Sequence, residues 1–271
     1  MNWTRLSSSF FFLTIVGSSA AQQESRHSIG VSIGGSAFGM RDEHASPMIY
    51  NGIGIAPTFE YSYNGDNDRH VLEGSYDYVS LNTTADNFHG ENRRARIRYS
   101  YLRCASDREL FNNRLTLFLG GSIGSYLSHT DFYFQYLPMN GIGHGNESWY
   151  WSNSIDFAAL LEYHPAVREA ISLRLSLPVV SSVARPTYSP SGNFNYVDGD
   201  WKFSPPWPWK SGMIQFFTDA FAVDAMLTYR RAVAGIFDLE LRYEFTFTGI
   251  DQPQQARMYE NALLAGILVR F

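Results

Sequence analysis

The residue types that could support ester hydrolysis occur together in one glycine-rich stretch, 143–148. His144 and Ser148 lie four positions apart there, and Asn146 or Asn153 could orient the histidine. A histidine base activates a serine hydroxyl for attack on an acyl group. The three groups must be held in hydrogen-bond geometry by a rigid element, which a glycine-rich stretch does not provide. His144 and Ser148 are therefore weak catalytic candidates, and the sequence favours a non-catalytic role.

Charged residues form a second set, because many of them recur at every other position. Side chains two apart lie on the same face of a strand, so acids and arginines can pair there. A row of arginines could instead select anions in a lumen. Glu162 and His164 share a face, but two ligands are too few for a metal site, and no cofactor is expected. The expected interior charges are Arg94, Arg96, Arg98, Glu60, Glu73, Asp77, Arg174, Asp238, Glu240, Arg242 and Glu244.

Alternation of apolar and polar residues extends well beyond these charges. A period of two, repeated this often, indicates a sheet with one apolar and one polar face. Ten segments show it: 28–34, 52–61, 72–78, 94–101, 115–124, 155–164, 171–177, 221–230, 237–248 and 258–271.

Long and short connections alternate between these ten segments. The odd connections include the two longest, 128–153 and 183–213, whereas the even ones, such as 64–68, are short. This pattern predicts one domain, 22–271, as a closed antiparallel up-and-down transmembrane β-barrel of about ten strands, with long extracellular loops and short periplasmic turns. Eight or twelve strands remain possible, because a long loop can hold a hairpin. The stretches 132–136 and 149–151 could also extend strands beyond the membrane.

The charged face is expected to point inward. A charge turned toward lipid would cost up to about 2–4 kcal/mol near the midplane. An eight-stranded barrel is filled by side chains and one of sixteen strands holds a channel, so ten strands lined by these charges predict a closed or narrow lumen.

The N-terminal residues read as an export signal. Arg5 supplies the positive region, 10–16 a short apolar region, and Ser19 to Ala21 a small-residue cleavage site, so 1–21 is expected to be removed. No later segment has the roughly 18 continuous apolar residues of a membrane helix. The formal net charge of −5 argues against nucleic acid as a partner, and Cys104, the only cysteine, has no partner for an intramolecular disulfide.

The final strand alternates apolar residues and stops on Phe271. A terminal phenylalanine on such a strand resembles the assembly signal of bacterial outer-membrane barrels, and the whole chain resembles a small Gram-negative outer-membrane β-barrel protein. The resemblance implies an outer-membrane location, both termini in the periplasm, contact with outer-membrane lipid and lipopolysaccharide, and recognition of Phe271 by the barrel-assembly machinery. Arg93 and Arg94 at the outer rim could contact lipopolysaccharide phosphates.

The long loops are the expected working surface. They hold Trp149, Trp151, Trp201, Trp207 and Trp209, and the proline-rich run 204–209 is stiff. Rigid aromatic side chains bind with little loss of entropy, so the loops could contact an extracellular glycan, a lipid head group or a protein. The other interpretation is that these rings rest on the outer leaflet or cap the barrel mouth.

Three functions remain open at this point. The first is a closed or narrow barrel that displays aromatic extracellular loops for ligand, surface or partner contact. The second is a narrow, porin-like diffusion channel. The third is a lipid-modifying hydrolase, because His144, Ser148 and an asparagine are similar to the residue types of outer-membrane phospholipase, although here the histidine and serine lie four rather than two apart.

Overall fold

Every regular element in the described part of the chain is a β-strand. The structure, a computed structural model, describes residues 26–43, 46–84, 88–111, 113–136, 141–185, 213–216, 220–251 and 255–271, with the backbone alone at 46–47, 134–136, 141–147, 213 and 220. The strands are β1 (His27–Asp42), β2 (Ser46–Ile55), β3 (Thr58–Asn64), β4 (Asp68–Asn82), β5 (Phe88–Leu110), β6 (Asn113–Tyr136), β7 (Gly141–Ala166), β8 (Glu169–Ala184), β9 (Met213–Phe216), β10 (Ala220–Ala234), β11 (Phe237–Ile250) and β12 (Ala256–Arg270). No helix among these residues is long and apolar enough to cross a membrane.

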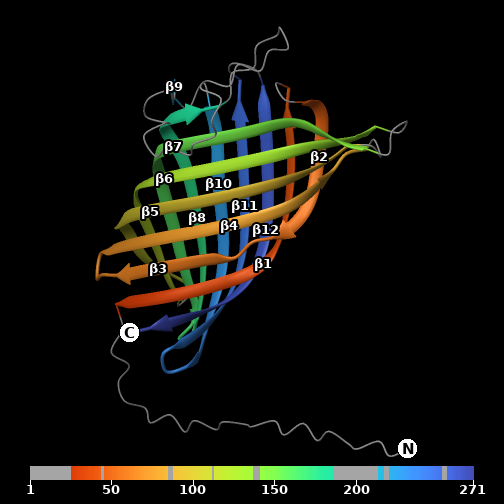
Figure 1. Ribbon diagram of the computed structural model, residues 1–271. Helices are drawn as coiled ribbons and strands as arrows, with labels where there is room; N and C mark the ends of the chain where they lie inside the picture. The colour runs from red at the N-terminus through yellow and green to blue at the C-terminus, as the bar shows by residue number, and fades with distance from the viewer. Residues whose placement is uncertain are drawn as a thin grey trace, which may run out of the picture.

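The twelve strands occupy ten positions around one closed antiparallel barrel (Figure 1). β2 and β3 both pair with β1 and β4, and β9 and β10 both pair with β8, so each couple fills one position. Pro57 lies between β2 and β3, where a residue without an N–H interrupts the hydrogen-bond ladder. The prediction of an up-and-down barrel of about ten strands is confirmed.

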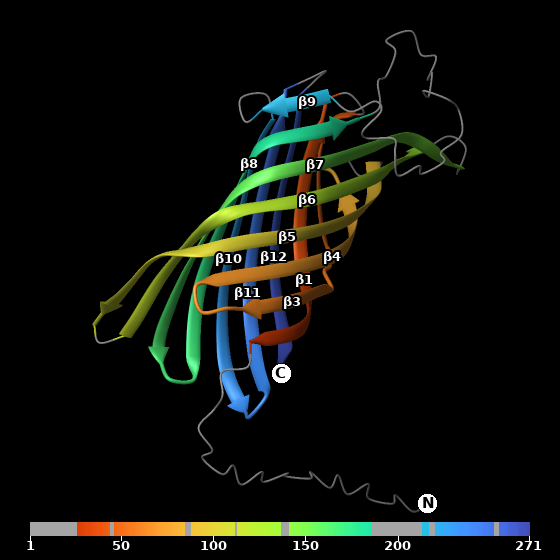
Figure 2. The same ribbon diagram turned by 90° about the vertical axis from the view of Figure 1, so that its left-hand side faces the viewer.

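The barrel closes where its first and last strands meet. β1 and β12 pair in unbroken register from Ser28 opposite Arg270 to Asp42 opposite Ala256. At the seam the N–H of His27 donates to the carbonyl of Phe271 (3.2 Å), and the N–H of Phe271 donates back (2.9 Å). Both chain ends of the barrel therefore lie at one end, called the lower end (Figures 1 and 2).

The lower end holds the short connections 65–67, 111–112, 167–168 and 235–236, and the upper end holds 43–45, 83–87, 137–140, 185–212 and 251–255. The expected loop over 128–153 is wrong as a loop, because β6 runs to Tyr136 and β7 starts at Gly141. Side chains continue to alternate there, with Ser128 and Thr130 buried and His129 and Asp131 on the other face, so the hairpin continues the sheet. Residues 186–212 lie outside the described residues.

The two faces of the sheet are segregated as in a membrane barrel. The outward row is apolar and exposed, for example Val31 (61%), Ile53 (78%) and Ile97 (57%), whereas the inward row includes Glu60 (4%) and Arg94 (1%). An apolar exterior with a polar interior is the reverse of a water-soluble domain and is the arrangement that lipid requires.

Candidate functional site

A layer of ion pairs crosses the middle of the barrel interior. We call it the charged layer, and its side chains come from β3, β4, β5, β8, β10, β11 and β12. Its members are Glu60, Glu73, Asp77, Arg94, Arg96, Arg98, Arg174, Asp224, Arg230, Glu240, Arg242, Glu244 and Glu260.

Glu60 of β3 is one centre of the charged layer. Arg230 of β10 donates to one of its oxygens at 2.6 Å, and Arg242 of β11 donates to the other. The same two arginines contact Glu240, at 2.7 Å from Arg230 and 2.9 Å from Arg242. Two guanidinium groups of the neighbouring strands β10 and β11 thus share Glu240 of β11 and Glu60 of β3, which is not adjacent to either strand in the sheet.

A second contact crosses the lumen from β4 to β8. Arg174 of β8 donates to Glu73 of β4, although the two residues are 101 positions apart in the chain. Glu73 also lies 3.6 Å from Arg242, which in turn lies 3.5 Å from Glu244. Arg242 therefore joins this contact to the Glu60 centre and is the hub of the layer.

The arginine row of β5 points inward, and its members share acidic partners on other strands. Arg98 donates to Asp224 of β10, and Arg96 lies 3.7 Å from the same carboxylate. Arg94 lies 2.9 Å from Glu260 of β12 and 3.7 Å from Asp77. The arginine row is thus paired with acids, as the first interpretation of the sequence predicted, and these acids come from the neighbouring strand β4 and from β10 and β12 across the lumen.

These ion pairs offset the free-energy cost of burying charged side chains in the interior. A buried charge without a partner is costly, and removing one member of a buried pair leaves the other uncompensated. Arginine suits the role because its planar fork can donate to two carboxylates at once. Glu260 is absent from the expected set, although its position on the inward row of the final strand could have identified it.

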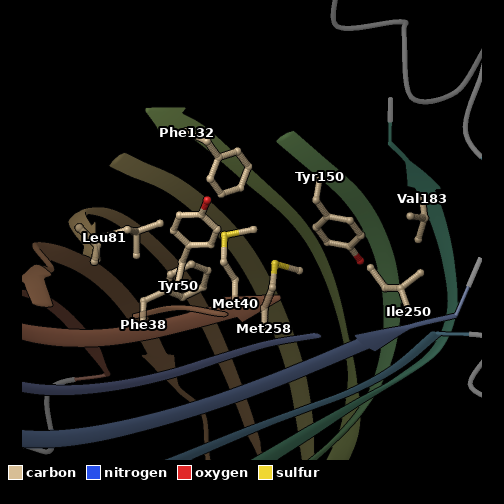
Figure 3. Close-up of a cluster of buried hydrophobic side chains, with 10 residues drawn as sticks. Phe38, Met40, Tyr50, Leu81, Phe132, Tyr150, Val183, Ile250 and Met258 are labelled. Atoms are coloured by element: carbon tan, nitrogen blue, oxygen red, sulfur yellow. The ribbon is translucent and has the colours of Figure 1, made fainter. Parts of the chain in front are cut away.

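Above the charged layer a group of buried apolar side chains gathers in the interior (Figure 3). We call this the apolar cluster: Phe38, Met40, Tyr50, Val79, Leu81, Phe132, Tyr150, Val183, Ile250 and Met258, all buried. Tyr50 and Phe132 lie with ring centroids 4.6 Å apart. Phe38 connects the two regions, because the guanidinium of Arg94 lies 4.2 Å from its ring centre. No pattern in the sequence predicted this cluster.

A small polar cavity of about 60 Å³ lies between strands β5 to β8, β10 and β11. Arg96, Arg98 and Asp224 line it together with a set of hydroxyl residues, Ser125, Ser152, Ser154, Ser181, Thr246 and Thr248. At roughly 10–15 Å³ each, it holds about four to six waters. Among the described side chains no group of three or more His, Cys, Asp or Glu is placed to hold a metal ion.

The two catalytic candidates are both on β7. Ser148 is buried, and its hydroxyl donates to Asp42 of β1 at 2.6 Å. Arg185 donates to the other oxygen of that carboxylate at 2.8 Å, so Asp42 joins β1, β7 and the end of β8 at the upper mouth. His144 pairs through its backbone with Tyr133, and its side chain is outside the description. Of these two catalytic candidates, only the Ser148 side chain is described, and its hydroxyl makes a structural hydrogen bond to Asp42.

Trp149 and Trp151 lie on strand β7 rather than in a loop. Both are on the outward face, opposite His129 and Leu127 of β6, and the indole N–H of Trp151 donates to Ser125 at 3.0 Å. They are partly exposed at the upper edge of the apolar exterior, which is where interfacial aromatic rings lie in membrane barrels. Trp201, Trp207 and Trp209 lie outside the described residues.

Arg93 and Arg94 do not form one cluster. Alternation sends Arg94 into the charged layer and Arg93 to the outside, where it lies 3.1 Å from Glu91 and 3.7 Å from Asp131. Only Arg93 is therefore available to a lipid head group.

Asp238 lies near the lower mouth rather than in the charged layer. It contacts Arg270 of the neighbouring strand at 3.0 Å.

No family model matches the chain, and no curated protein matches its sequence. Among solved structures, the outer-membrane protease OmpT from Escherichia coli is similar with a TM-score of 0.51 at 8% identity, over 92% of this chain and 98% of that chain. The translocator domain of autotransporter NalP from Neisseria meningitidis has a TM-score of 0.46 at 10% identity, over 93% and 90%. Ail from Yersinia pestis has 0.37 at 9%, over 90% and 99%.

These neighbours are all bacterial outer-membrane β-barrel proteins. The likeness to OmpT, together with the apolar exterior and the charged interior, identifies the fold of the chain as that of a bacterial outer-membrane β-barrel. Identities near one in ten carry the fold and no activity.

Proposed function

We propose that the protein is a closed outer-membrane barrel whose upper end makes contacts outside the cell. In this proposal residues 1–21 are removed on export, and the lower end, with both termini, faces the periplasm. Short turns at the lower end and the longest connection at the upper end support this orientation.

The observation that carries the proposal is that two barriers of different chemistry cross the same lumen. The charged layer spans it through contacts such as Arg174 to Glu73 and Arg98 to Asp224, between strands that are not neighbours. The apolar cluster lies above it and has no described cavity large enough for a solute. A passing ion would have to break paired charges and then enter an apolar region, and both steps are costly.

Planar-bilayer conductance of the refolded protein tests the closure. A heat-modifiability gel run beside it establishes that a barrel has formed. The expected result is a folded barrel without single-channel steps. Steady steps from the folded protein would contradict the closed barrel and make the porin-like channel the better interpretation.

The proposed contacts follow from the outer surface. The apolar exterior, with Trp149 and Trp151 at its upper edge, fits outer-membrane lipid, and Arg93 is available to lipopolysaccharide. Phe271, exposed at the seam, is the proposed contact for the assembly machinery. The tryptophan-bearing upper segments are the proposed surface for an extracellular glycan or protein.

A hydrolase is the less favoured candidate. The hydroxyl of Ser148 donates a hydrogen bond to Asp42, and Arg185 already pairs with that carboxylate. This arrangement does not supply the general base that would activate a serine nucleophile. The fold shared with a protease lends catalysis no support, because one barrel fold hosts many functions.

A further inference from the structure

Three adjacent turns at the lower end carry exposed apolar side chains. Phe111 is 84% exposed, Val167 is fully exposed and Val233 is 54% exposed. We call these three residues the lower ridge. Leu110 and Ile236 beside them are exposed as well.

The lower ridge is continuous across three hairpins. Arg114 of β6 pairs with His164 of β7, so the turns at 111–112 and 167–168 are neighbours. The N–H of Ala232 donates to the carbonyl of Arg168 at 2.8 Å, which brings the β10–β11 hairpin against the second turn. Figure 2 shows the three turns following one another along the lower edge.

The ridge lies beyond the depth of the lipid. Val167 lies four positions after the outward Tyr163, and Val233 lies four positions after the outward Tyr229. Four residues extend a strand by about 13 Å, which is about 10 Å in depth at the usual tilt. One head-group layer is only about 5–8 Å thick. On β10 the charged Arg231 interrupts the outward row between Tyr229 and Val233, which supports a tip that reaches past the head groups, whereas on β11 the outward row stays apolar to Phe237.

The turn geometry does not account for Phe111. Its φ is 52°, in the left-handed region where a bulky residue is strained and asparagine or glycine is favoured. An almost fully exposed aromatic residue at such a position is unfavourable twice: its backbone is strained, and its apolar ring is in contact with water. A contact with another molecule would account for it.

Arginines border the ridge. Arg108 of β5 and Arg168 of the second turn form no ion pair among the described residues, and Arg231 contacts only Glu169, at 3.9 Å. Of the two carboxylates nearby on β5, Asp107 pairs with Arg114, whereas Glu109 is exposed and forms no ion pair among the described residues, so the arginines outnumber the unpaired acids at this edge. A binding surface that complements this edge is apolar in the centre and acidic at its border.

We propose that the lower ridge is a docking surface for a periplasmic protein that presents an apolar strip bordered by carboxylates. The inference rests on the proposed orientation, in which the lower end faces the periplasm. An aromatic ring and two valines with a basic border match the composition of small, specific contact sites.

Thiol labelling of the full-length protein in the cell tests the docking. In a Cys104→Ser background, Val167→Cys is compared with Asp66→Cys, an equally accessible position (85% side-chain exposure) on the β3–β4 turn of the same end. A membrane-impermeant maleimide is added to dilute proteoliposomes and to cells with a permeabilised outer membrane. We expect equal rates in proteoliposomes and labelling of Val167→Cys about tenfold slower in cells, as for a partner present at about ten times its Kd.

A second variant separates docking from misfolding. Phe111→Asn with Val233→Thr, added to Val167→Cys, should restore fast labelling in cells, because the asparagine suits the left-handed turn and the heat-modifiability of the barrel should be unchanged. Arg108→Glu should also speed the labelling, whereas Ile49→Thr on the upper rim should not.

Each other outcome overturns a stated part of the inference. Equal labelling rates of Val167→Cys and Asp66→Cys in cells would show that no partner covers the ridge. Slow labelling already in dilute proteoliposomes would place the ridge in lipid, and slow labelling only at high protein density would identify a second copy of the chain. Labelling of Asp66→Cys in intact, unpermeabilised cells would instead overturn the proposed orientation.

Discussion

The charged layer and the apolar cluster close the same lumen by different physical means. In the charged layer each side chain depends on named partners, as Arg242 does on Glu60, Glu240 and Glu73. In the apolar cluster, side chains such as Leu81 and Ile250 need only neighbours of suitable volume. Closure by the charged layer therefore requires particular residues, whereas closure by the apolar cluster tolerates substitutions that keep the volume.

Removing the guanidinium of Arg242 should destabilise the barrel more than any other single substitution considered. Arg242→Met should reduce the free energy of unfolding by about 3–5 kcal/mol, because it leaves buried carboxylates uncompensated. Urea titration of the protein in lipid vesicles measures it. Arg93→Met, on the outer face, is the matched control and should cost less than about 1 kcal/mol. Equal losses for the two variants would contradict the specificity of the charged layer.

Cavity formation in the apolar cluster should follow. Leu81→Ala should reduce the free energy of unfolding by roughly 2–4 kcal/mol through lost burial and an unfilled volume. The loss should be independent of salt in the same urea titration, since no charge is involved. A loss that salt changes strongly would mean that the cluster is coupled to the ion pairs through Arg94 and Phe38.

Conservative substitutions should separate the charged layer from the apolar cluster more clearly. Arg242→Lys should still cost about 1.5–3 kcal/mol, because a lysine cannot reproduce hydrogen bonds from a planar fork to several carboxylates. Leu81→Met keeps the volume and should cost less than about 1.5 kcal/mol. A larger loss for Leu81→Met than for Arg242→Lys would mean that the apolar cluster, and not the charged layer, is the region that depends on particular residues.

Ser148→Ala should have a smaller effect, about 1 kcal/mol, through the loss of its hydrogen bond to Asp42. Phospholipid turnover by the refolded protein should be the same with and without the substitution. A hydrolytic activity that the alanine abolishes would reinstate the serine as a nucleophile.

The smallest expected effect lies on the outer wall. Trp151→Phe keeps an aromatic ring at the upper edge and loses the hydrogen bond to Ser125, which should cost no more than about 1 kcal/mol. Urea titration again measures it. A loss as large as that of Arg242→Met would mean that this edge, and not the interior, dominates the stability of the barrel.

Much of the fold could be predicted because strand alternation is local. Glu60 and Arg94 fall on the inward row by parity alone, and Arg94 shares it with Arg96 and Arg98. The hairpin over 128–153 could be predicted as strand only at 132–136 and 149–151, which lie on β6 and β7, because His129 and Asp131 replace the apolar outward row just before 132. A polar outward row beyond the membrane has the composition of a loop.

The candidate site could be predicted only in part. Parity identifies the inward charges but not their partners, since Glu73 and Arg174 are brought together by the closure of the barrel. The apolar cluster was missed because each strand contributes only one or two members, such as Phe38 and Met40 of β1, and no segment shows a run of apolar inward residues. Arg185 of the Asp42 contact lies at the end of β8, where no periodic pattern continues.

The seam between β1 and β12 has a consequence for biogenesis. The first strand finds its second neighbour only when the last strand exists, so during synthesis its edge stays unpaired through the whole length of the chain. Pairing the most distant segments carries the largest loop-closure cost and comes late. A nascent chain of this protein therefore reaches the membrane as an open, edge-exposed polypeptide that has to be shielded from aggregation until its final strand arrives.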